Sequence, residues 1–203
     1  MHAFVGADAD DATLDDVAAH VREALALLRR APRRLRAIPD FDAIMARQPP
    51  TGAGEHAMAD RAVGGYANPT SIILEPRREG DHAVATVSFG PAFEGALGRV
   101  HGGMVAAVFD DLMGYVLAMI REPAFTGRLI VNYKAPVPME TPVEFRAWMR
   151  GREGRKLFVD AEARLGDTVL ATAEILFVVV DQEHFATHAS ELLGLARPAD
   201  AGA

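Results

Sequence analysis

Residues 98–103, Gly98-Arg99-Val100-His101-Gly102-Gly103, precede an apolar run from Met104 to Ile120, and together they decide the fold of this chain. The run is apolar on all sides of a helical wheel, which is typical of a helix enclosed within a core. Two adjacent carboxylates, Asp110 and Asp111, interrupt it near the middle. Because burying a carboxylate without a partner is costly, we expect this helix to meet a cleft there or to give the carboxylates buried partners.

The residues at the start of this helix suit a site for a developing negative charge. Gly102 and Gly103 let a ligand approach the backbone, and the first turn of a helix offers unpaired N–H groups with a favourable dipole. Such donors stabilise an oxyanion. His101 lies nine residues before Asp110 (110 − 101), about two and a half helical turns, so the two side chains would point to opposite faces if His101 continued the helix. This geometry favours a site between two subunits.

Length and composition fit one domain with an extension. The chain has 203 residues, 50% of them hydrophobic, and a chain of this length buries about 70% of its unfolded surface. The absence of cysteine excludes a disulfide framework and a thiolate metal site, and it fits a cytoplasmic protein. His184 and His188 share a helical spacing without an evident third ligand, so we predict no metal site. The net charge of −7 argues against broad nucleic-acid binding, which needs a basic surface.

We expect neither a secretory signal nor a membrane span. The first 20 residues lack a basic segment followed by an apolar core and carry instead Asp8, Asp10, Asp11, Asp15 and Asp16. The apolar run after Gly103 is too short for a span once its aspartates are counted, because each costs roughly 2.5–3.5 kcal/mol at a membrane centre. The sequence therefore predicts a soluble protein.

The chain is predicted to divide into three parts. Hydrophobic residues at three- and four-residue spacing predict an amphipathic helix over 11–30, whose apolar face we expect to pack on its own domain. A connector rich in proline and glycine follows and is expected to cover one edge or mouth of the main domain. The parts are an N-terminal helical extension and connector (1–65), the main domain (66–181) and a C-terminal tail (182–203).

Strand patterns surround the central helix in the main domain. Apolar and polar residues alternate with period two over 143–150, as in a sheet with one face on a core. The predicted strands are 71–75, 82–89, 128–134, 143–150, 157–165 and 169–181, with turns at 80–81, 151–154 and 166–167. One long apolar helix is thus followed by an antiparallel meander. We predict an α+β fold with the sheet wrapped around the helix.

Three features of this sequence occur together in one known family. They are the hexapeptide at 98–103, Asp110 nine residues after His101, and the segment Leu129-Ile130-Val131-Asn132-Tyr133-Lys134-Ala135-Pro136-Val137-Pro138. With them, residues 66–181 resemble the hotdog-fold acyl-CoA thioesterases of the PaaI type. The resemblance implies a hotdog fold, self-association as a dimer or tetramer, and hydrolysis of an acyl-CoA thioester. It implies coenzyme A as part of the substrate, and no separate cofactor.

The resemblance also implies roles for individual residues. Asp110 takes the position of the catalytic carboxylate, which acts as nucleophile or as general base on water. A backbone N–H of Gly102 or Gly103 is expected to polarise the thioester carbonyl. Thr126 takes the place of a hydroxyl that helps to position water beside the aspartate. His101 is expected to orient the loop, to contact the substrate or to cap the helix.

Further residues are candidates for substrate contacts or for structural roles. Asp111, about 100° further round the helix than Asp110, is expected to be structural or to support its neighbour. Some family members carry an asparagine six residues before the histidine, where this chain has Gly95 beside Glu94; Glu94 is either an exposed loop carboxylate or a participant in the reaction. Arg99 is a candidate for contact with the phosphates of coenzyme A because it stands next to the helix entrance. Four cations crowd one hairpin and form either a solvated turn or a phosphate contact for coenzyme A: Arg150, Arg152, Arg155 and Lys156.

Two other functions fit the same features. A hotdog dehydratase or hydratase acting on acyl thioesters needs a histidine and a carboxylate at one reacting centre, and Glu94 with His101 would supply them. A non-catalytic acyl-CoA binder or sensor would keep the cavity and exclude water, with the helix at 11–30 as its regulatory part. Release of the thiol distinguishes the thioesterase from both alternatives.

Overall fold

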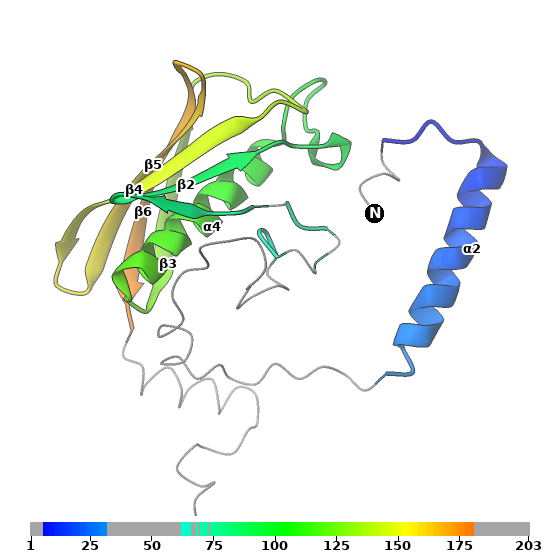
Figure 1. Cartoon of the computed structure of the whole chain (residues 1–203), viewed down its shortest axis with the longest axis horizontal. Coiled ribbons are helices and arrows are strands. Elements are labelled where there is room, and N and C mark those ends of the chain that lie inside the picture. Colours follow the sequence, from blue (N-terminus) through cyan, green and yellow to red (C-terminus); the bar gives the residue numbers. More distant parts are fainter. Residues whose placement is uncertain (1–5, 32–61, 66–67, 69, 73, 181–203) are drawn as a thin grey trace, which may run out of the picture.

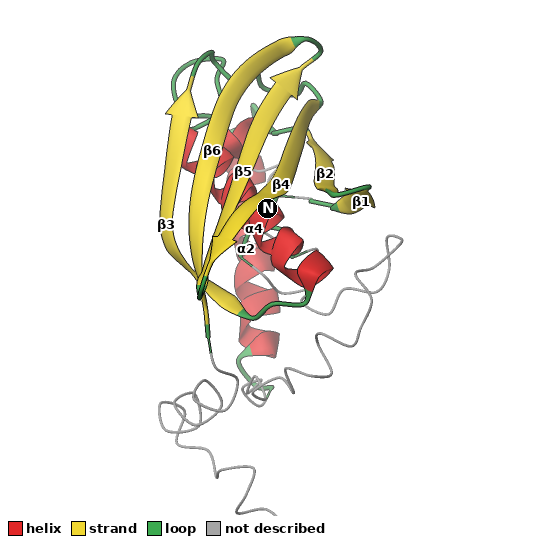
Figure 2. Cartoon of the chain, turned by 90° about the vertical axis from the view of Figure 1, so that its left-hand side faces the viewer, coloured by secondary structure: helices red, strands yellow, loops and turns green. Residues whose placement is uncertain are grey.

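The structure, a computed structural model, describes residues 6–31, 62–65, 68, 70–72 and 74–180. Within them, one antiparallel sheet of six strands, in the order β1-β2-β4-β5-β6-β3, curves around helix α4 (Gly102–Ile120), as Figures 1 and 2 show. The strands are β1 (Arg77–Glu79), β2 (His82–Val87), β3 (Ala124–Tyr133), β4 (Val143–Glu153), β5 (Lys156–Leu165) and β6 (Thr168–Val179). The predicted α+β class is confirmed.

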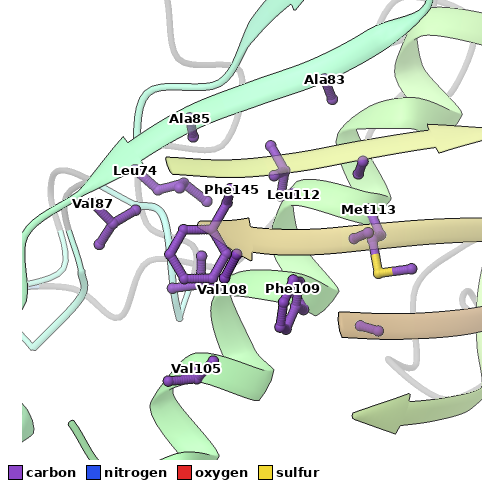
Figure 3. Close-up of a cluster of buried hydrophobic side chains, with 14 of the residues drawn as sticks. Leu74, Ala83, Ala85, Val87, Val105, Val108, Phe109, Leu112, Met113 and Phe145 are labelled. Atoms are coloured by element: carbon purple, nitrogen blue, oxygen red, sulfur yellow. The ribbon is translucent and has the colours of Figure 1, made fainter. Parts of the chain in front are cut away.

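Helix α4 is enclosed because apolar residues occupy almost its whole circumference. Its buried residues are Val105, Val108, Phe109, Leu112, Met113, Tyr115, Val116 and Leu117. Figure 3 shows Val105, Val108, Phe109, Leu112 and Met113 among side chains of β2 and β4. The ring centroids of Phe109 and Phe145 lie 5.2 Å apart. By length and composition α4 also meets the criterion for a membrane-crossing helix, which core helices of soluble proteins meet as well.

The predicted strands differ from the structure in several places, one of which is β3, which begins at Ala124 and not at 128. The described residues among 71–75 lie outside any strand, and the first strand begins at Arg77. The hydroxyl of Ser71 donates to two nearby backbone carbonyls, and such local bonding competes with a sheet ladder. The turn predicted at 151–154 is also displaced, because β4 continues to Glu153 and the chain reverses at Gly154, where φ is +58°. A two-residue hairpin turn favours glycine with positive φ.

Helix α2 (Asp11–Leu28) forms where the amphipathic pattern predicts it, and Asp10 caps it by accepting from the Thr13 N–H at 2.8 Å. The prediction that its apolar face packs on its own domain is wrong. Among the described residues α2 contributes none to the core, and Val21 is 52% exposed. Figure 1 shows α2 at the right, away from α4 and the sheet. Most of the predicted connector and the tail after 181 lie outside the described residues.

Candidate active site

A cavity of about 590 Å³ lies at the N-terminal end of α4. The loop before α4, the first turn of the helix and the segment after β3 form its walls. Its polar and charged lining residues are Glu94, Arg99, His101, Tyr133 and Lys134. Two cations face one carboxylate there, although the whole chain carries a net charge of −7. The cavity therefore suits an anionic ligand better than the average surface of this protein does.

His101 caps α4. Its backbone is extended (φ −61°, ψ 128°), and its Nδ1 accepts from the N–H of Gly103 at 3.0 Å, so the ring in this tautomer carries its proton on Nε2. The N–H groups of Met104 and Val105 donate to the carbonyl of His101 at 2.9 and 3.3 Å. Within the described part of the chain, the Gly102 N–H is the first-turn donor left without an acceptor. Of the two predicted oxyanion donors, the structure therefore favours Gly102 over Gly103.

Asp110 and Thr126 form a hydrogen-bonded pair near the N-terminal end of β3, whereas the C-terminal end of this strand lines the cavity. The Thr126 hydroxyl donates to Oδ1 of Asp110 at 3.0 Å, and both residues are exposed in the single chain. Among the described residues that line the cavity, Asp110 is absent. At a rise of 1.5 Å per residue, it lies about 12 Å from Gly102 along the helix axis. One chain thus carries a helix N-terminus in a cavity and, separately, a carboxylate with a hydroxyl partner.

A β-bulge turns Thr126 toward α4. Between Thr126 and Arg128, β3 advances two residues while its partner β6 advances one, which leaves Gly127 as the extra residue. Bulges bend a strand and re-aim its side chains. Without the extra residue, Thr126 would share the outward face of Ile130. A Cβ on Gly127 would lie 3.3 Å from a backbone carbonyl oxygen of β6, which explains why glycine stands in the bulge.

Asp111 has a different environment from that of Asp110. It is partly buried and faces the turn at 62–65, because a Cβ on Gly64 would come within 2.5 Å of its Oδ2. The space beside this carboxylate is just large enough for a glycine. The role of Asp111, structural or in support of Asp110, stays a prediction.

The structure explains why residue 95 is a glycine, where some members of the family that the sequence resembles carry an asparagine. A Cβ on Gly95 would lie 2.7 Å from Cα of His101, so the loop in this conformation has no room for a side chain there. The neighbouring Glu94 lines the cavity, and its Oε1 accepts from the Gly98 N–H at 2.6 Å. Glu94 therefore holds the loop before α4 in place, and it also contributes to the wall of the cavity.

The basic hairpin is separate from the cavity. Among the described residues that line the cavity, Arg99 is present and the four hairpin cations predicted with it are absent. The hairpin arginines have other partners: Arg150 bonds Glu174, Arg152 bonds Glu122 and Arg155 bonds the carbonyl of Val179. The remaining cation, Lys156, opens β5. A contact of this hairpin with coenzyme A stays a prediction.

Tyr133 and Lys134 line the cavity but were not predicted as site residues. Both belong to the segment 129–138. The sequence of this segment predicts a strand, but it does not indicate which other elements lie beside the end of that strand. The Tyr133 hydroxyl donates to the carbonyl oxygen of Gly102 at 2.6 Å. Partial burial raises the pKa of the Tyr133 hydroxyl, which at its usual value is already a protonated donor at neutral pH. The residues that the structure describes contain no cluster of three or more His, Asp or Glu suited to a metal ion.

One antiparallel sheet around a central helix, with a cavity at the helix N-terminus, defines a hotdog-type domain. Residues 97–172 match the model of the thioesterase superfamily. The solved structure of RHA08564, a thioesterase superfamily protein, has the same fold with a TM-score of 0.73 at 24% sequence identity. That match covers 87% of this chain and 88% of the other.

Curated relatives match a shorter part of the chain. The acyl-coenzyme A thioesterase THEM4 of Bos taurus is 33% identical over 100 residues, which are 48% of this chain and 41% of that protein. The THEM4 protein of Mus musculus is 35% identical over 92 residues, 44% of this chain and 40% of that protein. This chain therefore spans about two fifths of the length of the curated relatives that it matches.

A hypothetical thioesterase protein from Streptococcus pneumoniae shares the fold and was solved with coenzyme A. Its TM-score is 0.50 at 16% identity, over 54% of this chain and 90% of that one. In one further structure of that protein alanine replaces an aspartate, and in another alanine replaces a threonine. These two positions lie sixteen residues apart. Asp110 and Thr126 have the same separation here.

Proposed function

We propose that this domain hydrolyses an acyl-CoA thioester to a free acid and coenzyme A. The observation that carries the proposal is the placement of two complementary groups on one helix. Gly102, whose N–H has no acceptor among the described residues, lines a cavity, and the Asp110 carboxylate accepts from the Thr126 hydroxyl. The first group suits a carbonyl oxygen and the second suits the attacking side of the same reaction. The thioesterase names among the relatives support this reaction class.

We infer that a second copy of the chain completes the site. A separation of about 12 Å along α4 keeps Gly102 and Asp110 of one chain from acting on one carbonyl carbon. Within the described residues β3 is an edge strand, and Ile130 is 41% exposed on it. Antiparallel pairing of two β3 edges across a two-fold axis would set the Tyr133 end of one strand beside the Thr126 end of the other. Asp110 of one copy would then face the helix start of the other.

In the proposed reaction, the thioester carbonyl oxygen accepts from the Gly102 N–H, which stabilises the negative charge that develops on it. Asp110 of the facing copy either takes a proton from a water molecule that attacks the carbonyl carbon, or attacks that carbon itself. In both routes the carbon–sulfur bond breaks and the departing thiolate of coenzyme A takes up a proton. In the second route a water molecule then hydrolyses the anhydride between the acyl group and Asp110, which releases the free acid and restores the carboxylate. Thr126 holds the carboxylate in place. The Asp–Thr separation shared with the Streptococcus pneumoniae protein is a further reason to test both residues.

Arg99 and Lys134 are the cations that this proposal assigns to the phosphates of coenzyme A. Both line the cavity that contains Gly102, in a chain that is acidic overall. An acidic protein has to gather positive charge locally to hold a phosphorylated ligand. Coenzyme A in the structure of the Streptococcus pneumoniae protein supports this ligand class on the same fold.

The first prediction concerns Asp110→Asn. This substitution removes the proton acceptor or nucleophile but keeps the size of the side chain, so thiol release should fall by at least about a hundredfold. The measurement is thiol release from short, long and aromatic acyl-CoAs. The control is Asp167→Asn, the same chemical change at an exposed turn between β5 and β6, which should keep native activity and the native melting temperature. Equal rates for native protein and Asp110→Asn would contradict the proposal.

A hotdog hydratase or dehydratase is the second candidate, because Glu94 and His101 line the same cavity. Both side chains already hold backbone N–H groups, Glu94 that of Gly98 and His101 that of Gly103. Each retains a further polar atom, the second carboxylate oxygen and Nε2. Loss of the enoyl chromophore from an enoyl-CoA without thiol release would favour this reaction over hydrolysis.

A further inference from the structure

The hydroxyl of Tyr133 joins the end of β3 to the first turn of α4. It donates to the carbonyl oxygen of Gly102 at 2.6 Å, across 31 residues of sequence. The ring lies close to the same residue, because a Cβ on Gly102 would be 3.3 Å from both Cζ and Oη of Tyr133. Tyr133 also forms part of the cavity wall. The edge of the sheet is thereby tied to the turn that presents the unpaired N–H.

The same peptide group is bonded at its other end. The carbonyl of Gly102 and the N–H of Gly103 belong to one peptide unit, and that N–H donates to Nδ1 of His101 at 3.0 Å. A chain of bonds thus runs from the Tyr133 hydroxyl through this peptide to the imidazole of His101. Hydrogen bonds in such a chain polarise and strengthen one another. A peptide anchored on both sides has little freedom to rotate, although glycine flanks it.

We propose that Tyr133 is a positioning residue for the reaction assigned to this cavity. By holding the Gly102–Gly103 peptide, its hydroxyl fixes the backbone of the turn that follows directly on the Gly102 N–H, and it keeps His101 in its capping orientation. The inference rests on the proposed function, since it assigns Gly102 as the donor to the thioester carbonyl. Tyr133 acts through Gly102, so its loss should slow the chemical step while substrate binding persists.

Tyr133→Phe tests this assignment, because it keeps the ring against Gly102 and removes the O–H. We expect kcat for thiol release to fall about tenfold with KM unchanged. The control is Tyr115→Phe, which makes the same chemical change on α4, at a buried residue outside the cavity wall. Native kcat in Tyr133→Phe would overturn the proposal, as would equal losses in the two variants.

A second measurement, made without any substrate, tests whether Tyr133 orders the first turn of α4. Hydrogen exchange of the Gly103 amide, followed by NMR, should accelerate several-fold in Tyr133→Phe and stay native in Tyr115→Phe. A lower kcat with native exchange would overturn the positioning role, because the hydroxyl would then act on the substrate itself. If the native protein releases no thiol from any acyl-CoA, the proposed function fails. The exchange result would still confirm or overturn the proposal that Tyr133 orders the first turn of α4.

Discussion

Two glycines determine how closely the chain packs around the start of α4. Gly95 lies against the backbone of His101, and Gly102 lies against the ring of Tyr133. Each contact would be shortened to 3.3 Å or less by a methyl group, so neither position accepts alanine without movement. The cavity wall therefore depends on glycines as much as on the polar residues that line it.

Gly95→Ala should destabilise the domain by about 1–3 kcal/mol, because its Cβ would lie 2.7 Å from a backbone atom that has little room to shift. Urea unfolding of the purified variant measures the effect. Gly151→Ala is the matched control, since a Cβ there meets nothing within 4 Å, and its unfolding midpoint should stay native. If the two variants unfold at the same midpoint, the loop before α4 relaxes more easily than its packing indicates.

At the scale of elements, β3 connects both parts of the proposed site. It contacts α4 through Thr126 near its start and through Tyr133 at its end, while its outer edge is unpaired within the described part of the chain. A long unpaired edge invites another strand, and proteins that stay monomeric often protect such edges with charge. Here Phe125 and Ile130 are 53% and 41% exposed on that strand. The element is suited to self-association.

Ile130→Lys should weaken self-association and abolish thiol release in parallel, because a lysine on the edge opposes pairing of two β3 strands. Sedimentation and activity, both measured over a range of protein concentrations, test this. Leu165→Lys introduces the same residue at a similarly exposed position, 38% against 41%, on the interior strand β5. It should leave the oligomer and its activity native. An active Ile130→Lys monomer would contradict a site shared between two copies.

At the scale of the whole molecule, the features that could be predicted from the sequence are those with a local hydrophobic pattern. The apolar run of α4 and the alternation in β4 and β5 are strong signals, so the α+β class and most strand positions were predicted and are confirmed. The strand at 71–75 was wrong, because side-chain hydrogen bonds hold Ser71 in a turn. Tyr133 and Lys134 were missed because their role depends on where β3 ends beside α4. That contact is long-range, and no local pattern contains it.

The unpacked helix α2 leads to a prediction for the stability of the whole domain. Val21→Asp should change the free energy of unfolding by less than about 0.5 kcal/mol, because no described residue of α2 is buried. Phe109→Ala, which removes a fully buried ring, should cost about 3–5 kcal/mol. Thermal unfolding of both variants against the native protein tests the contrast. A large loss in Val21→Asp would show that α2 is covered by a partner in solution.

The bulge at Gly127 also imposes a rule of parity on β3. Thr126 and Tyr133 are seven positions apart, an odd number, and residues at odd spacing face opposite sides of a regular strand. The single extra residue makes this odd interval behave as an even one, so both hydroxyls reach α4. Deleting or adding one residue anywhere between them would therefore turn one of the two away from the helix. The length of this interval is as much a part of the site as the identity of its residues.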